Sequence, residues 1–163
     1  MLQIIKEYKN LDKAQLFGPG PWVKEADKIQ MLQVETDFDC LIVRHPHSGH
    51  LCGYVGVPET HPYFKKGYDE IGVEVHGGLT FANLCAPHGK EEESVCHVPL
   101  PGRSDQVWWL GFDCAHAGDK SPIDKKYGFD YSHVYQTYKT IDYVKEEIEK
   151  LALQLKKISQ HGN

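Results

Sequence analysis

The chain has 163 residues, of which 40% are hydrophobic and 25% charged, and its formal net charge is −5. This is the composition of an ordinary globular protein, and the length allows one domain with a sizeable core. The negative balance argues against long nucleic acid as a partner, and no apolar run approaches the ~18 residues of a membrane span. With no signal-peptide pattern after Met1, we expect one cytoplasmic domain over residues 1–163 with no membrane partner.

The first part of the chain divides into a polar region and a sheet-like region. Residues 1–38 are mixed and polar, with a short strand expected at 2–5 and a loop, FGPGPW, at 17–22. Residues 39–116 have the pattern of a sheet core. Strands are expected at 39–44, 50–58, 71–82, 94–98 and 106–114, separated by loops rich in glycine, proline and charge.

The C-terminal part, residues 140–160, has the pattern of an amphipathic helix. Its apolar residues recur at spacings of 3, 4, 3, 4 and 3, at Ile141, Val144, Ile148, Leu151, Leu155 and Ile158. Such a stripe packs across a sheet, or it pairs two chains into a homo-oligomer. We favour packing on the sheet, which predicts an α+β fold: an antiparallel β-sheet packed against a long C-terminal helix.

One candidate site lies in the segment VEVHGGLT at 73–80. In a strand, Glu74 and His76 share a face, and Gly77 and Gly78 leave the backbone bare beside them. An acid and a histidine next to exposed backbone are typical of a ligand pocket. The plainer interpretation is a solvent-facing strand that ends in a Gly-Gly turn.

A second candidate lies in the segment VWWLGFDCAHAGD at 107–119. In a strand, Trp109 and Asp113 share one face, so Trp109 is expected to wall a pocket. Trp108 falls on the alternate face, together with Leu110 and Phe112, and is expected in the core. If the two central strands are neighbours, His76 joins this pocket.

Asp113, His116 and Asp119 follow one another at intervals of three residues. They could hold a divalent metal, with His76 or Glu74 as a further ligand. They could also form a metal-free polar pocket in which His76 or His116 is the general acid or base and Asp113 orients it. The third interpretation is a capped turn in which the carboxylates bind main-chain amides.

The five cysteines, an odd number, suggest free thiols or metal ligands more than a disulfide framework. The pattern Cys85-x2-His88 followed by Cys96-His97 could surround zinc. Adjacent residues of a strand point to opposite faces, which counts against both Cys96 and His97 binding one ion. A pair of reduced thiols, Cys85 and Cys96, is the plainer account.

Few positive residues lie near these motifs. Arg44 ends an apolar strand and Arg103 lies in a Pro-Gly loop, so both could meet a phosphate group at a pocket rim. Tyr54 or Trp109 could then stack on a base. Each arginine could equally be a surface charge.

Several long motifs together carry a resemblance. They are CLIVR at 40–44, GYVGVPETHP at 53–62, VHGGLT at 75–80, WWLGFDCAHAGD at 108–119 and YVKEEIEKLALQL at 143–155. Over residues 39–155 the chain resembles a family of small uncharacterised proteins from phages and bacterial genomes. The resemblance implies a viral or prophage setting, and that the His76 motif and the 113–119 motif form one site. It implies no reaction.

Three functions are open at this point. The first is binding of a small polar, nucleotide-like ligand in a His-, Asp- and Trp-lined pocket, as in a phage protein that sequesters a host defence signal in the host cytosol. The second is a phosphodiesterase-like hydrolase at the same pocket, with a divalent metal as a possible cofactor. The third is a structural or interaction role for the C-terminal helix.

Overall fold

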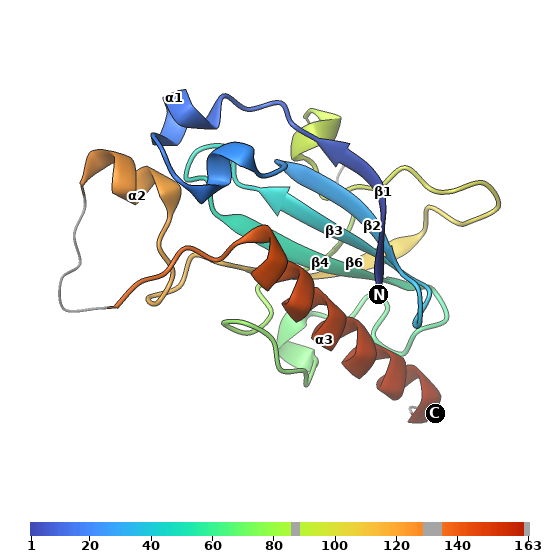
Figure 1. Cartoon of the computed structure of the whole chain (residues 1–163). Coiled ribbons are helices and arrows are strands. Elements are labelled where there is room, and N and C mark those ends of the chain that lie inside the picture. Colours follow the sequence, from blue (N-terminus) through green and yellow to red (C-terminus); the bar gives the residue numbers. More distant parts are fainter. Residues whose placement is uncertain (86–88, 129–134, 162–163) are drawn as a thin grey trace.

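The computed structural model describes residues 1–85, 89–128 and 135–161 of the chain. Figure 1 shows a twisted sheet with one long helix lying across it and short helical pieces around its edges. The elements in chain order are β1 (Leu2–Tyr8), α1 (Lys13–Phe17), η1 (Pro21–Lys24), β2 (Lys28–Gln33), β3 (Phe38–Arg44), β4 (Leu51–Pro58), η2 (Tyr68–Glu70), β5 (Phe81–Leu84), η3 (Glu91–Glu93), β6 (Val107–Asp113), α2 (Pro122–Tyr127) and α3 (Ile141–His161).

The six strands form one sheet in the order β1-β2-β3-β4-β6-β5, and every neighbouring pair is antiparallel. The first four strands are neighbours in the sheet in the same order as in the chain. The chain then leaves the sheet, returns as the short edge strand β5, and returns again as β6 between β4 and β5. In the centre, Tyr54 of β4 lies opposite Leu41 of β3 on one side and Gly111 of β6 on the other.

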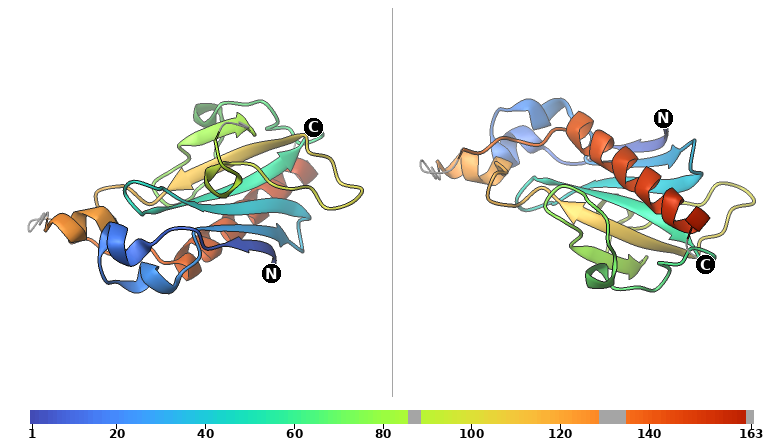
Figure 2. Two further views of the ribbon diagram at one scale, coloured as in Figure 1. Left: turned by 90° about the horizontal axis from the view of Figure 1, so that it is seen from above. Right: turned by 90° about the horizontal axis from the view of Figure 1, so that it is seen from below.

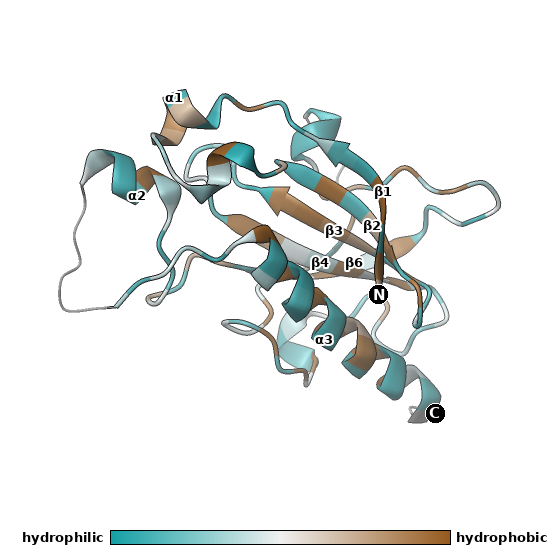
Figure 3. Ribbon diagram, in the orientation of Figure 1, coloured by the Kyte–Doolittle hydropathy of each residue, from teal (hydrophilic) through white to brown (hydrophobic). Residues whose placement is uncertain are grey.

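Helix α3 packs across one face of the sheet, as the views in Figures 1 and 2 agree. Val144, Ile148, Leu151 and Leu155 are fully buried against the main core. Figure 3 shows the matching pattern, in which hydrophobic and hydrophilic residues alternate along α3 while the central strands are largely hydrophobic. The predicted α+β fold is confirmed. The apolar stripe of the helix is covered by the sheet from Val144 to Leu155. Pairing of two chains along the stripe, the alternative to packing on the sheet, stays a prediction.

The opposite face of the sheet is covered by the segment between β5 and β6, which lies on the other side from α3 in Figure 2. Beneath it lies a second cluster of side chains: Leu41, Val43, Tyr54, Val107 and Trp109. The buried Lys28 ammonium fastens the segment, donating to the carbonyl oxygens of Glu91 at 2.5 Å and Cys96 at 2.9 Å. Gln30 adds a pair of hydrogen bonds to the main chain of Val98.

Two of the predicted strands are wrong. Residues 71–80 form an extended segment that turns at Gly77, and only Phe81–Leu84 joins the sheet. Residues 94–98 also lie outside any strand. In both segments the main chain forms hydrogen bonds with side chains instead of with a neighbouring strand. Gln154 pairs with the main chain of Glu74, and Gln30 pairs with that of Val98.

The N-terminal region contributes more to the sheet than predicted. Residues 2–8 and 28–33 supply two of its six strands, so the sheet core is not confined to 39–116. Strand β2 is almost entirely buried, because β1 and β3 flank it and the segment after β5 covers it. The sequence pattern does not predict a buried strand here, because Lys28 and Gln30 are polar. In the structure both are buried and have hydrogen-bond partners.

Cys85 and Cys96 form a disulfide. The sequence-based expectation of reduced thiols, or of zinc held by these two cysteines, is therefore corrected. His88, the third proposed zinc ligand, lies outside the described residues. The bond joins two residues that are 11 positions apart in the sequence and helps to hold the covering segment in place.

Among the helices that the structure describes, none is both long and apolar enough to cross a membrane.

Candidate functional site

Four of the predicted site residues meet where β6 ends and α3 begins. The imidazole rings of His76 and His116 lie 5.8 Å apart between centroids and are tilted by 59°. His76 Nε2 is 2.8 Å from Asp119 Oδ2, and His116 Nε2 is 3.3 Å from Asp113 Oδ1. Each histidine therefore has its own carboxylate. The predicted meeting of the VHGGLT motif with the 113–119 motif is what the structure shows.

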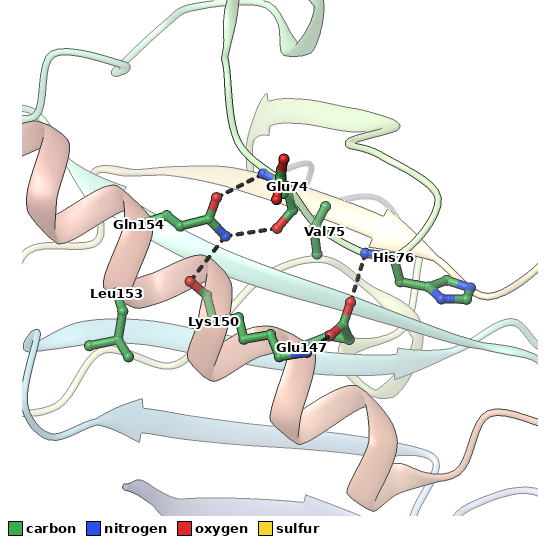
Figure 4. Close-up of a pocket in the computed structure, with 7 residues that line it drawn as sticks. All are labelled: Glu74, Val75, His76, Glu147, Lys150, Leu153 and Gln154. Carbon is green, nitrogen blue, oxygen red and sulfur yellow. Dashed lines mark hydrogen bonds and ion pairs between the residues drawn. The ribbon is translucent and has the colours of Figure 1, made fainter.

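His76 is positioned by the helix, not by a neighbouring strand. Its main-chain N–H donates to Glu147 Oε1 at 2.8 Å, and two turns further along α3 the Gln154 amide pairs with both main-chain groups of Glu74. Figure 4 shows these bonds across the groove between α3 and residues 74–76, with the His76 ring directed away from the other six residues. The Glu147 side chain is 10% exposed.

Both ring nitrogens of His76 are engaged. Nε2 faces Asp119, and Nδ1 lies 2.7 Å from the hydroxyl of Tyr143. If Nε2 carries the proton and donates it to the carboxylate, Nδ1 accepts from the tyrosine O–H. Burial raises the pKa of Tyr143, so its hydroxyl stays protonated and can donate a hydrogen bond to His76 Nδ1.

Asp119 connects the two histidines. Its Oδ2 accepts from His76 and also from the main-chain N–H of His116, at 3.0 Å, while Lys139 Nζ lies 3.2 Å from Oδ1. The side chain is 1% exposed. Burial alone would raise the pKa of this carboxyl; the hydrogen bonds from His76 and the His116 amide, together with the nearby Lys139 ammonium, outweigh it, so the pKa is below its ordinary value of 3.8.

His116 is the more open histidine of the pair, with 34% of its side chain exposed against 15% for His76. Its Nε2, Cδ2 and Cε1 atoms lie directly against Gly77, so a Cβ on that glycine would overlap the ring. The outward edge of the ring is therefore the one that carries Nδ1. Asp113 is itself held by Thr80 Oγ1 at 3.1 Å and by the Ala115 N–H at 3.1 Å.

The bonds from main-chain amides to Asp113 and Asp119 are those of the predicted capped turn, and the loop is a turn rather than a helical piece. The capped-turn interpretation is thus confirmed in part, and the pocket interpretation stays a prediction. Among the described residues, no three His, Cys, Asp or Glu side chains are grouped so that they could hold a metal ion. The predicted ligand set of Asp113, His116 and Asp119 is corrected accordingly.

Sequence reasoning missed Tyr143 and Lys139. A signal for the first exists: Tyr143, Glu147, Lys150 and Gln154 are spaced by 4, 3 and 4 residues, so they form a polar stripe beside the apolar one on α3. Three of these four contact residues 74–76. Nothing in the local sequence marks Lys139, whose role depends on the pairing of Thr137 with Asp119.

A cavity of about 300 Å³ opens beside His116. Its lining is polar except for two alanines: Ala115, His116, Ala117, Asp119, Ser121, Asp124 and Gln136. A wider, shallower groove of about 540 Å³ runs between α3 and residues 74–76, on the other side of His76.

The aromatic residues expected at the pocket lie elsewhere. Trp109 and Tyr54 are buried beneath the covering segment, on the face of the sheet opposite α3, and the Trp109 ring packs edge-on against His97. Trp108, expected in the core, is only partly buried on the helix side and donates its indole N–H to the main-chain carbonyl oxygen of Lys66. The predicted division of the two faces of β6 is correct, but the exposures of the two tryptophans are reversed.

The two arginines expected to bind phosphate are also elsewhere. Arg44 is 1% exposed, and its guanidinium contacts Asp27, Glu25 and Tyr138 in a buried network. Arg103 fastens the covering segment to β3 and the turn before it, pairing with Asp39 at 3.4 Å and with Asp37 at 2.9 Å. Neither borders the cavity beside His116.

The site is flanked by Glu74, Gly77 and Gly78, and Glu74 does not supply one of its carboxylates. Glu74 is exposed and is held through its main chain. Gly77 supports His116, and Gly78 donates its N–H back to Val75, closing the turn.

Compared with protein-family models, curated proteins and solved structures, the chain matches none of them.

Proposed function

We propose that this protein is a hydrolase in which His116 transfers protons at the bond that is cleaved. The observation that carries the proposal is the arrangement of His116 and His76, two imidazoles from distant segments, side by side and each next to a carboxylate. A partly exposed histidine beside a carboxylate and a cavity is a suitable general base and acid.

In the proposed reaction His116 Nδ1 takes a proton from a water molecule as the water oxygen bonds to the electrophilic centre of the substrate. The bond to the leaving group breaks, and the imidazolium returns the same proton to that group. Asp113, 3.3 Å from Nε2, stabilises the imidazolium between the two steps. Asp119 holds the main chain of His116, His76 holds Asp119, and Tyr143 holds His76, so these three are positioning residues.

The nucleotide-sequestering function suggested by the sequence has less support. Its stacking and phosphate-binding groups, Tyr54, Trp109, Arg44 and Arg103, do not gather at the cavity. The phage setting rests on the resemblance, and a cytoplasmic location is likewise a proposal. The Cys85–Cys96 disulfide argues against it, because thiols are usually kept reduced in the cytosol.

The test is hydrolysis of a panel of p-nitrophenyl esters, glycosides and phosphodiesters. We expect one class to be cleaved, and His116→Ala to lower kcat/KM by about 10²–10⁴-fold. His76→Ala should lower activity and shift the pH profile, because it acts through the position of His116. The matched control is His47→Ala, an exposed histidine outside the site. Cleavage of no class, or equal activity of the His116 and His47 variants, would contradict the proposal.

A further inference from the structure

The cavity beside His116 has the size of a small-molecule site, at about 300 Å³. Apart from His116 its polar lining consists of Asp119, Ser121, Asp124 and Gln136. None of its lining residues, all of them in the described part of the chain, is a lysine or an arginine. A ligand in this cavity therefore meets two carboxylates and no cation from the wall.

One of these carboxylates carries an acceptor without a well-formed partner. Asp119 Oδ1 is buried and, among the described residues, receives no hydrogen bond of good geometry, although Lys139 Nζ lies 3.2 Å away. A buried acceptor in this state is costly, and a donor from a ligand would satisfy it. Lys139 balances the charge of Asp119, so the charge that is left at the cavity belongs to Asp124.

The lysines that follow Asp124 do not neutralise it. Lys125 donates to the carbonyl oxygen of Pro19, and Lys126 donates to that of Gln15. Both therefore reach toward the N-terminal part of the chain. Asp124 itself is half-buried in the first turn of α2 and lines the cavity.

We infer that this cavity binds the part of the substrate that carries an ammonium group. The ammonium would lie near the Asp124 carboxylate and donate to its oxygen atoms and to Asp119 Oδ1. Hydroxyl groups of the same ligand would meet Ser121 and Gln136. An anionic group would lose its hydration at a wall that carries the uncompensated charge of Asp124 and no lysine or arginine, and would be excluded. The inference rests on the proposed hydrolase function in one respect only, namely that the ligand is the substrate.

The experiment uses three probes that share one ring and differ in charge: glucosamine, glucose and glucose 6-phosphate. Each is titrated into the ¹⁵N-labelled whole chain, and the shifts of the amides of residues 115–124 are followed. We expect glucosamine to bind about fivefold more tightly than glucose, the factor that a charge pair 4 Å apart gives in water, and glucose 6-phosphate to bind weakest. Asp124→Asn should bring the first two together, whereas Asp69→Asn, which removes an exposed acid elsewhere, should leave the order unchanged.

Tightest binding by glucose 6-phosphate, equal binding of all three probes, or no shift at residues 115–124 with any of them would overturn the inference. Binding is read without turnover, so the two proposals fail separately. Amide shifts with the expected order in a protein that hydrolyses nothing would contradict the hydrolase alone. Hydrolysis that depends on His116 without any preference for the cation would contradict the cavity alone.

Discussion

At the residue scale, the position of His116 depends on the absence of a side chain at Gly77. This glycine has a φ of +67°, and a Cβ there would overlap the imidazole of His116. The next residue, Gly78, has a φ of +81° but nothing within 4 Å of its Cβ position. The two neighbours thus share the backbone strain of a substitution and differ only in the contact with His116.

We predict that Gly77→Ala displaces His116 and that Gly78→Ala does not. Both variants should lose about 1–2 kcal/mol of stability from the left-handed backbone. Only Gly77→Ala should also shift the imidazole resonances of His116 and lower any hydrolytic activity. Urea unfolding and histidine-edited NMR spectra of both variants give the comparison. The same imidazole shift in both would mean that strain, not the contact, positions the ring.

The pKa of Asp119 gives the protein a stability term of known sign. A carboxyl whose pKa is lower in the folded chain binds a proton more tightly when the chain is unfolded, so acid favours unfolding. The stabilisation is complete above the unfolded value of 3.8, and it is lost as the pH falls from there through the lower folded value. We expect the urea midpoint to fall over this range, and to fall less in Asp119→Asn. Parallel pH profiles for the two proteins would contradict this.

At the scale of the element, α3 serves two surfaces at once. Its apolar stripe packs on the sheet, and its polar stripe, beginning at Tyr143 and ending at Gln154, receives residues 74–76. The sheet and the VHGGLT segment are therefore attached to one rigid helix, and the distance from His76 to Asp119 is set by how that helix lies. This is why the site can be built partly from a segment that has no regular structure.

We predict that Leu151→Ala lowers the free energy of unfolding by about 2–5 kcal/mol, because it leaves a cavity in the main core. Leu153, two residues away, is 52% exposed, and Leu153→Ala should change stability by less than about 0.5 kcal/mol. Denaturant unfolding of the two variants, with sedimentation analysis, checks both values. A Leu151 variant that separates a dimer into folded monomers would show that the stripe joins two chains instead.

At the scale of the whole molecule, a buried ionic network connects the N-terminal region to the start of α3. Asp27 Oδ1 is paired with Lys13 at 2.8 Å and with Arg44 at 3.2 Å. Glu25 contacts Arg44 and, through its other oxygen, accepts the N–H of Ile141 at the first residue of α3. The network thus holds together three parts of the chain that are far apart in sequence.

We predict that Arg44→Met destabilises the protein by about 3 kcal/mol or more, because it leaves buried carboxylates with too few partners. Lys6→Met is the matched control: it removes a lysine paired with Glu91 on the surface, where ion pairs contribute little, so its midpoint should stay near that of the parent. Thermal unfolding of both variants decides. If Arg44→Met changed hydrolysis without changing stability, Arg44 would belong to the site after all.

The sequence predicts the fold class well because hydrophobic periodicity is a local signal. The stripe from Ile141 to Leu155 predicts α3, and the alternation through 106–114 predicts β6 and its two faces. Residues 71–76 alternate in the same way, yet the helix supplies their partner, and periodicity alone cannot tell a strand from an extended segment. Likewise, the sequence around an arginine at the end of an apolar strand does not show whether the side chain faces a pocket rim or, as Arg44 does, a buried carboxylate.

By itself, then, the sequence determined that there is an antiparallel sheet, which helix covers it, and that VHGGLT and 113–119 supply the residues of the candidate site. Only the tertiary structure decided which side chains of those motifs meet: His76 with Asp119 and Tyr143, and His116 with Asp113 and Gly77. The structure also places Trp109, Arg44 and Arg103 away from the cavity. The physical reason is that patterning reports burial along one element, whereas contacts such as those of His76, which span 43 and 67 residues, depend on how separate elements pack.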